Sequence, residues 1–263
     1  MSTVLDSIIE GVLEDVKARQ VPLSQLRERL DSAPKLRGAL AALRQPGTHI
    51  ISEVKRSSPS KGELADIASP GKLAEQYQAG GASVVSVLTE ERRFKGSIKD
   101  FEEVRSAIDL PVLRKDFIVT EFQILESRIL GADLLLLIVA GLSQTQYEDY
   151  YQMATELGMD VLVEVHNHDE LERAFAIEPS IVGVNSRNLK TLDLDARIFD
   201  ELIPEIPSKV VRVAESGIST RHEVEHIEML GGNAILVGET LVKAGNPGEA
   251  ISRLLGREQT GSL

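Results

Sequence analysis

The sequence predicts an α/β fold in which eight strand–helix units close into a single (β/α)8 barrel, a TIM barrel, preceded by a helical extension. Eight short runs rich in Val, Ile and Leu alternate with amphipathic stretches, and their starts are spaced by roughly 20 to 35 residues. Polar residues gather at the end of nearly every run. A length of 263 residues fits one barrel domain over residues 1–263.

The first 45 residues carry a helical pattern. Leu5, Ile8, Val12 and Val16 recur at three- and four-residue spacing, and the leucines between positions 26 and 43 continue in the same manner. A Pro-Gly pair at positions 46–47 then ends the pattern. We therefore expect residues 1–45 to form a helical extension in front of the barrel.

The predicted strands are residues 49–54, 83–88, 111–115, 133–139, 160–165, 181–185, 210–214 and 234–237. Three of them follow a Gly-Ala or Gly-Gly pair, which is typical of a helix C-cap that turns the chain back into a sheet. Residues 134–139 are continuously apolar, as parallel strands buried on both faces require.

An open, doubly wound sheet is the alternative arrangement of such units. No G-x-G-x-x-G pattern follows the first strand, as a dinucleotide-binding open sheet would lead one to expect. Polar residues also end nearly all of the strands, whereas an open sheet concentrates them near one switch point. The sequence therefore favours the closed barrel.

Composition excludes several functions. Asp and Glu outnumber Lys and Arg by 41 to 29, and the formal net charge of −12 argues against binding nucleic acid or anionic membranes. With no cysteine, the chain has no disulfide, catalytic thiolate or cysteine-bound metal. The longest apolar run, residues 134–140, is too short to span a bilayer, and no secretory signal is visible. We expect a cytoplasmic protein, monomeric or weakly self-associating.

Charged and amide side chains follow five of the predicted strands, and residues two apart on a strand share a face. The residues concerned are Glu53 and Lys55, Lys115, Glu164, Asn185 with Arg187, and Glu215. Each one alone is most simply the start of a solvated loop. A buried charge is costly unless it is paired, so lysines and glutamates collected around one barrel mouth indicate function.

The chemistry of this set is proton transfer. Burial lowers the pKa of a lysine and a neighbouring carboxylate raises it, so one cavity can supply both a proton donor and an acceptor. Lys55, Lys115, Glu53 and Glu164 are the predicted catalytic groups, suited to reactions at a carbonyl or an enamine. No histidine or carboxylate cluster accompanies them, so we expect no catalytic metal.

The loops after the last two strands predict a phosphate site. Ser216-Gly217 and Gly238-Glu239 supply glycines that let backbone N–H groups approach an anion, and a short helix beginning near Glu239 would point its positive end there. Barrel enzymes frequently hold phosphate at this place. Residues 56–62 form a predicted mobile lid, and Phe94 and Phe117 are predicted apolar walls.

Residues 222–226 match the H-E-x-x-H pattern of zinc proteases, but we reject that interpretation. On a helix over residues 220–230 the apolar side chains share one side, and His222 and His226 lie away from it, toward solvent. By strand parity His166 can approach the site, whereas His168 belongs to a loop or the start of the next helix.

Taken together, these segments resemble the indole-3-glycerol phosphate synthase family. The match is carried, in family order, by residues 53–60 (EVKRSSPS), 113–118 (LRKDFI), 162–166 (LVEVH), 183–189 (GVNSRNL), 214–218 (AESGI) and 236–239 (LVGE). The resemblance implies that 1-(2-carboxyphenylamino)-1-deoxy-D-ribulose 5-phosphate closes to indole-3-glycerol phosphate with loss of carbon dioxide and water. It implies a step of tryptophan biosynthesis that uses no cofactor.

Residue roles follow from the same resemblance. Lys115 resembles the general acid that polarises the substrate carbonyl, Glu164 its acidic partner, and Glu53 and Lys55 the pair used in later proton transfers and dehydration. Pocket residues are implied at Asn185, Arg187, Glu215, Ser216, Phe94 and Phe117, and phosphate contacts at Ser58, Gly217, Gly238 and Glu239. The implied partner is a small anionic phosphosugar-anthranilate substrate, whose carboxylate and phosphate suit the cationic side chains of the mouth.

The sequence departs from the family pattern at three places. Glu90 to Phe94 stand where an Asp followed by paired aromatic residues is usual, Thr120 stands where an acidic residue is common, and Ser186 replaces a frequent Asn. None of the three departures affects a predicted proton-transfer group, so the implied activity is kept. The departure at residues 90–94 instead concerns the cavity wall formed by the loop after the second predicted strand.

Two rival functions remain open at this point. An imine-forming aldolase barrel would use Lys115 or Lys55 as a nucleophile. A barrel that only binds a phosphorylated ligand would have lost catalysis, although both lysines and both glutamates are retained.

Overall fold

The computed structural model, which describes residues 3–257, contains a closed barrel of eight parallel strands. The strands are β1 (His49–Val54), β4 (Val84–Leu88), β5 (Val112–Lys115), β6 (Leu134–Ile138), β7 (Asp160–Val165), β8 (Ile181–Asn185), β9 (Val211–Glu215) and β10 (Ala234–Val237). β10 pairs with β1 and closes the ring. The predicted (β/α)8 barrel is confirmed, and every predicted strand boundary lies within one residue of the observed one.

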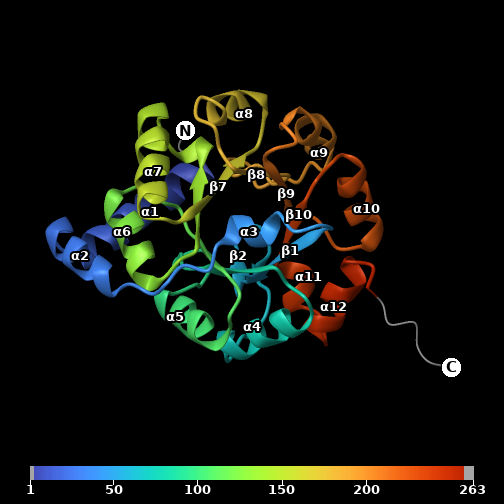
Figure 1. The fold of residues 1–263 in the computed structure, drawn as a ribbon, viewed down its shortest axis with the longest axis horizontal. Helices are drawn as coiled ribbons and strands as arrows, with labels where there is room; N and C mark the ends of the chain where they lie inside the picture. The colour runs from blue at the N-terminus through green and yellow to red at the C-terminus, as the bar shows by residue number, and fades with distance from the viewer. Residues whose placement is uncertain (1–2, 258–263) are drawn as a thin grey trace.

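Helices surround the barrel as an outer ring (Figure 1). They are α4 (Pro70–Ala79), α5 (Ile98–Ala107), α6 (Glu121–Leu130), α7 (Gln144–Glu156), α8 (His168–Ala174), α9 (Arg197–Leu202), α10 (Arg221–Met229), α11 (Glu239–Val242) and α12 (Pro247–Leu254). Most begin at a Ser, Thr or Asn whose side chain accepts a hydrogen bond from a backbone N–H of the first turn. None of the helices in residues 3–257 has the length and apolar content needed to cross a membrane.

The N-terminal extension is helical only in parts, which corrects the expectation for residues 1–45. It comprises α1 (Val4–Arg19), α2 (Leu23–Arg29), a short 3-10 turn and α3 (Ala39–Leu43), and residues 1–2 lie outside the described part. Residues 33–38 are neither helix nor strand, because Pro34 cannot continue a helix and Gly38 adopts a positive φ of 69°. The N–H of Leu40 donates to Asp160 at the start of β7, which fixes α3 at the N-terminal end of the barrel.

Alternation along the strands divides the buried residues into two sets. Inward-facing side chains such as Ile51, Leu113 and Leu162 form one apolar cluster that also includes residues of α1 and α3. Outward-facing side chains such as Ile50 and Val163 pack against the ring of helices. The interior of the barrel is therefore an apolar floor, above which the last inward positions of the strands form the mouth.

Candidate active site

The C-terminal ends of the strands surround a cavity of about 420 Å³. Every residue that the sequence assigned to the site lines this cavity: Glu53, Lys55, Ser58, Phe94, Lys115, Phe117, Glu164, Asn185, Arg187, Glu215, Ser216, Gly217, Gly238 and Glu239. They converge because each charged residue stands at an inward position near a strand's end. In the pairing register Asn185 is opposite Glu215, and Glu164 is opposite Gly183, two residues before Asn185 on β8.

Lys115 lies between two buried carboxylates. Its Nζ is 3.3 Å from Glu164 Oε2 and 3.5 Å from Glu215 Oε2. Asn185 Nδ2 donates to the other oxygen of Glu164 at 3.1 Å. Among the described residues, Glu164 Oε2 and both oxygens of Glu215 have no hydrogen-bond partner. Buried acceptors of this kind, facing a cavity, are available to a substrate.

This arrangement fixes the charges of the first pair. Burial alone would lower the pKa of Lys115, but Glu164 and Glu215 outweigh it and hold that pKa above its usual value. Burial would raise the pKa of Glu164, yet Lys115 and a neighbouring histidine hold it below its usual value. An ammonium ion therefore faces a carboxylate at neutral pH.

Glu215 carries a different charge state. Burial and the nearby charge of Glu164 raise the pKa of Glu215 above its usual range, because two carboxylates so close to each other do not both ionise easily. Glu215 is thus the carboxyl group of the mouth that takes up a proton most readily.

Glu53 and Lys55 form a second ion pair, with Nζ 2.6 Å from Glu53 Oε1. Burial would raise the pKa of Glu53, but Lys55 and Lys115 together lower it. Both residues belong to the end of the first strand, and Glu53 is 2% exposed. The cavity thus contains two ammonium–carboxylate pairs from different strands.

Two glycines make room for these carboxylates. A Cβ atom at Gly183 would collide with Glu215 Oε1, and one at Gly238 would lie 2.7 Å from Glu53 Oε1. The sequence assigned Gly238 to phosphate binding alone, and no signal pointed to Gly183. The structure adds a steric role for both, because any side chain would displace a charged group of the mouth.

We expect Gly183→Ala to lower kcat by about tenfold, since a shift of roughly 1 Å in a group that positions the reacting atoms is enough to cost that much. The added methyl group pushes the carboxyl group of Glu215 away from Lys115. Steady-state kinetics measure the effect. Gly245→Ala is the matched control, because a Cβ there meets no atom within 4 Å; equal activity in the two variants would contradict the steric role of Gly183.

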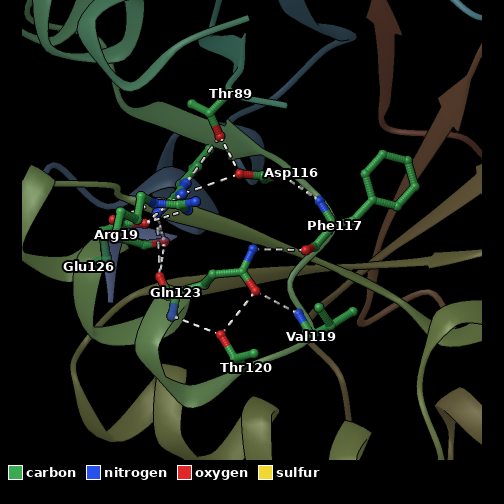
Figure 2. A network of polar contacts seen from close by, with 10 residues as sticks. Arg19, Thr89, Asp116, Phe117, Val119, Thr120, Gln123 and Glu126 are labelled. Carbon is green, nitrogen blue, oxygen red and sulfur yellow. Dashed lines mark hydrogen bonds and ion pairs between the residues drawn. The ribbon is translucent and has the colours of Figure 1, made fainter. Parts of the chain in front are cut away.

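Behind Lys115, a buried polar network holds the end of β5. Arg114, which is fully buried, donates to Thr89, Asp116 and Glu126. Figure 2 shows Thr89, Asp116 and Glu126 in this network, and Arg19 of α1 joins it through Glu126. The charge of Arg114 is paired on the outer side of the strand, so the neighbouring Lys115 is held facing the cavity.

Gln123 of α6 holds the loop between β5 and α6 in place. Its Nε2 donates to the carbonyl of Phe117 at 2.9 Å, and its Oε1 accepts from the N–H of Val119 at 3.0 Å (Figure 2). The ring of Phe117 packs against that of Phe94, with centroids 6.0 Å apart. The two predicted apolar walls are therefore one aromatic surface of the cavity.

The loop after β4 is organised by Glu90, at the place where the sequence departs from the family pattern. Its carboxylate accepts hydrogen bonds from the backbone N–H groups of Arg92, Arg93 and Phe94, at 3.1, 2.7 and 2.8 Å. Lys95 then adopts a positive φ of 54°, which turns the chain back. Glu90 therefore positions Phe94 against the cavity.

Removing this carboxylate, as in Glu90→Ala, frees three N–H groups and loosens Phe94. We expect KM to rise about tenfold with a smaller change in kcat, because a cavity wall binds the ground state and the transition state alike. Initial rates over a range of substrate concentrations separate the two constants. The exposed neighbour provides the control Glu91→Ala; an unchanged KM in Glu90→Ala would show that the loop does not need its carboxylate.

The predicted phosphate loops lie at one side of the cavity. Ser216 and Gly217 both adopt positive φ values, 70° and 75°, which is a strained conformation for a serine. The short helix expected near Glu239 is α11. The carboxylate of Glu239 pairs with Lys61 and Lys243, at 2.8 Å each. The predicted anion contact at the start of this helix therefore falls to the backbone and not to the Glu239 side chain.

The loop after β1, which the sequence predicts to be a mobile lid, has local structure of its own, and its mobility stays a prediction. It contains a small antiparallel hairpin, β2 (Ser57–Ser58) with β3 (Gly62–Glu63). Lys61 at its tip reaches Glu239, and Glu63 pairs with Lys95 of the neighbouring loop at 3.2 Å. The hairpin lines the cavity together with these loops.

Sequence reasoning missed several lining residues. Ile8 of α1, Leu136 and Ile138 of β6, and Lys243 also line the cavity. The apolar residues carry no signal that separates a cavity wall from core, and in the sequence Lys243 is indistinguishable from a solvated lysine.

The histidines follow the sequence analysis. Val224 and Ile227 of α10 are buried, His222 is exposed, and His226 pairs with Asp200 of α9. Residues 3–257 contain no group of three or more His, Cys, Asp or Glu side chains that could hold a metal ion. His166 lies beside Glu164, whereas His168 is the first residue of α8.

The fold and this charged mouth are those of a (β/α)8-barrel enzyme. The family model of indole-3-glycerol phosphate synthase matches residues 5–254. An indole-3-glycerol phosphate synthase of Mycolicibacterium smegmatis is 50% identical over 97% of this chain and 94% of its own, and indole-3-glycerol phosphate synthase 1 of Streptomyces coelicolor is 51% identical over 96% and 95%. The chain belongs to the indole-3-glycerol phosphate synthase family, the decarboxylating lyases of tryptophan biosynthesis.

Solved structures of lower identity share the fold. The N-acetylmannosamine-6-phosphate 2-epimerase of Clostridium perfringens aligns with a TM-score of 0.60 at 15% identity, over 81% of this chain and 93% of its own. The 3-hexulose-6-phosphate synthase of Salmonella typhimurium aligns with a TM-score of 0.61 at 13% identity, over 80% and 97%. These likenesses concern the barrel alone.

Proposed function

We propose that the cavity closes 1-(2-carboxyphenylamino)-1-deoxy-D-ribulose 5-phosphate to indole-3-glycerol phosphate, with Lys115 as general acid. The observation that carries this proposal is the position of Lys115 Nζ, 3.3 and 3.5 Å from two buried carboxylates in a cavity with a second ammonium–carboxylate pair. An ammonium ion held in a desolvated site stabilises the negative charge that develops on a carbonyl oxygen.

The reaction then divides among the named groups. Lys115 gives a proton to the carbonyl oxygen as the ring carbon bearing the carboxylate attacks the carbonyl carbon, and Glu164 stabilises the positive charge that develops on the ring nitrogen. Carbon dioxide leaves and restores the aromatic ring. The new hydroxyl group leaves as water after taking a proton from Lys55, while Glu53 accepts one from the substrate.

The remaining predicted residues suit the two ends of the substrate. Phe94 and Phe117 offer an apolar surface for its aromatic ring, and Arg187 is a cation for its carboxylate. The backbone of residues 216–217 and 238–239, with Ser58, suits the phosphate. Asn185 supports the site by holding Glu164.

The direct test is to add this substrate to the purified protein and follow indole fluorescence. The chain contains no tryptophan, so the product signal rises against a low background. Sustained appearance of indole-3-glycerol phosphate with release of carbon dioxide is expected. A protein that binds the substrate without turnover would be the ligand-binding barrel.

The aldolase alternative is disfavoured by the charge of Lys115. An imine-forming lysine must lose its proton to act as a nucleophile, whereas the carboxylates beside Lys115 hold its pKa above the usual value. Borohydride treatment in the presence of substrate should leave the mass of the protein unchanged; a trapped adduct on Lys115 or Lys55 would favour the aldolase.

A further inference from the structure

His166 is a buried titratable residue that the proposed reaction does not use. It follows β7 directly, and its side chain is 6% exposed. Its Nε2 lies 3.2 Å from Glu164 Oε1, and its Nδ1 lies 2.9 Å from Glu170 Oε2. The ring therefore lies between a carboxylate of the cavity and a carboxylate of α8.

Glu170 is built to hold the ring in place. One of its oxygens also accepts the backbone N–H of His166 at 2.8 Å, and the other accepts Asn167 Nδ2 at 2.8 Å. Burial would raise the pKa of Glu170, but His166 outweighs it and holds that pKa below its usual value. An ionised Glu170 requires that Nδ1 carry a proton.

The protonation of Nε2 then decides whether the imidazole ring of His166 is neutral or positively charged. If the ring were neutral, the lone pair of Nε2 would face the lone pairs of an ionised Glu164, which is repulsive. If the ring is protonated, Nδ1 donates a hydrogen bond to Glu170, and Nε2 forms an ion pair with Glu164 Oε1 at 3.2 Å without hydrogen-bond geometry. Burial lowers the pKa of His166, but Glu164 and Glu170 together raise it to about 9, so the imidazolium form is present at neutral pH.

Within residues 3–257, His166 forms ion pairs with Glu164 and Glu170 and with no other residue. The charged side chains that contact the ring in the described part of the chain are Glu164 on β7 and Glu170 on α8. Arg173 on α8 donates instead to the backbone carbonyls of Val139 and Leu142. The 3-10 turn η2 (Val139–Gly141), which packs against both β7 and α8, has no titratable side chain.

We propose that His166, oriented by Glu170, is a positioning residue that keeps Glu164 ionised and directs its second oxygen toward Lys115. Asn185 Nδ2 and His166 Nε2 both approach Glu164 Oε1, which leaves Oε2 to Lys115 and the cavity. The inference rests on the proposed role of Glu164. A histidine paired with a second carboxylate thus supports the acid–base pair from outside the substrate cavity.

The test begins with the native protein. Histidine ¹⁵N spectra recorded from pH 6 to 10 report which ring nitrogens carry protons, and the spectrum of His166→Gln identifies the signal of His166 among the five histidines. Both nitrogens of His166 should remain protonated up to about pH 9. A neutral His166 ring at pH 7 would overturn the proposal. This measurement needs no turnover, so it stands apart from the test of the proposed function.

Kinetics complete the test with two variants. Glu170→Gln removes one of the two charges that raise the pKa of His166, so the alkaline limb of the kcat profile should move down by about one pH unit. His166→Gln keeps a donor without charge; its kcat should fall about tenfold and its acidic limb should move upward. The matched control is His168→Gln, an exposed histidine two residues away.

The outcomes are distinct. A shifted profile in Glu170→Gln and His166→Gln, with a native profile in His168→Gln, supports the positioning role. If both variants keep native limbs and differ only in a uniform loss of activity, the residues are merely structural and the proposal fails. Full activity in Glu164→Gln would instead refute the proposed role of Glu164 in catalysis, while leaving the spectroscopic result on His166 intact.

Discussion

Replacing Lys115 by alanine should lower kcat by about 10⁴-fold, the upper end of what one general acid contributes. Lys115 is the ammonium ion that lies between Glu164 and Glu215, and among the described residues no other cation makes an ion pair with Glu164 Oε2 or Glu215 Oε2. Without it, the substrate carbonyl has no proton donor and the developing oxyanion has no countercharge. Single-turnover rates measured by indole fluorescence would show the loss.

The fold should survive this substitution. Glu215, whose pKa is already raised, takes up a proton, so no uncompensated pair of charges remains in the barrel. Circular dichroism and thermal melting verify that the variant is folded. Lys72→Ala makes the same chemical change on the exposed face of α4 and should behave as the native protein. Near-native turnover by Lys115→Ala would refute its role as the acid.

Glu164→Gln should lower kcat by about 10³-fold while KM changes little. Glutamine keeps the volume of the side chain and can still accept the hydrogen bond from Asn185, so the change removes charge with little change in shape. The loss concerns an interaction that strengthens as positive charge develops in the transition state, and such interactions appear in kcat.

The control for this variant is Glu172→Gln, an exposed position on α8. Initial rates at saturating and limiting substrate distinguish the two constants. An effect on KM alone, with native kcat, would mean that Glu164 binds substrate without assisting the chemistry.

The strands and the charged mouth could be predicted from the sequence because both depend on short-range periodicity. A period of two assigns Glu53, Lys115 and Glu164 to the inward face once the strand ends are known, and closure of the barrel brings them together. The glycine-containing loops after the seventh and eighth strands follow from the same register.

The remaining features depend on tertiary contacts that no local pattern encodes. Gly183 matters because of the side chain of Glu215 on the next strand, and Ile8 lines the cavity because of how α1 packs. The hairpin after β1 and the break at residues 33–38 depend on local turns within segments whose overall pattern suggested loop and helix. The pairing of His166 with Glu170 is a local contact between residues four apart, but the contact of the same ring with Glu164 depends on where β7 ends and α8 begins.

The account treats Lys115 and Glu164 as one acid–base unit assembled from separate strands. A double-mutant cycle with Lys115→Ala, Glu164→Gln and the combined variant tests this most directly, with kcat as the readout. If the two residues act together, the combined variant should be only slightly slower than Lys115→Ala alone. Losses that multiply, so that the combined variant is slower than Lys115→Ala by the full factor seen for Glu164→Gln, would show that the two side chains act independently.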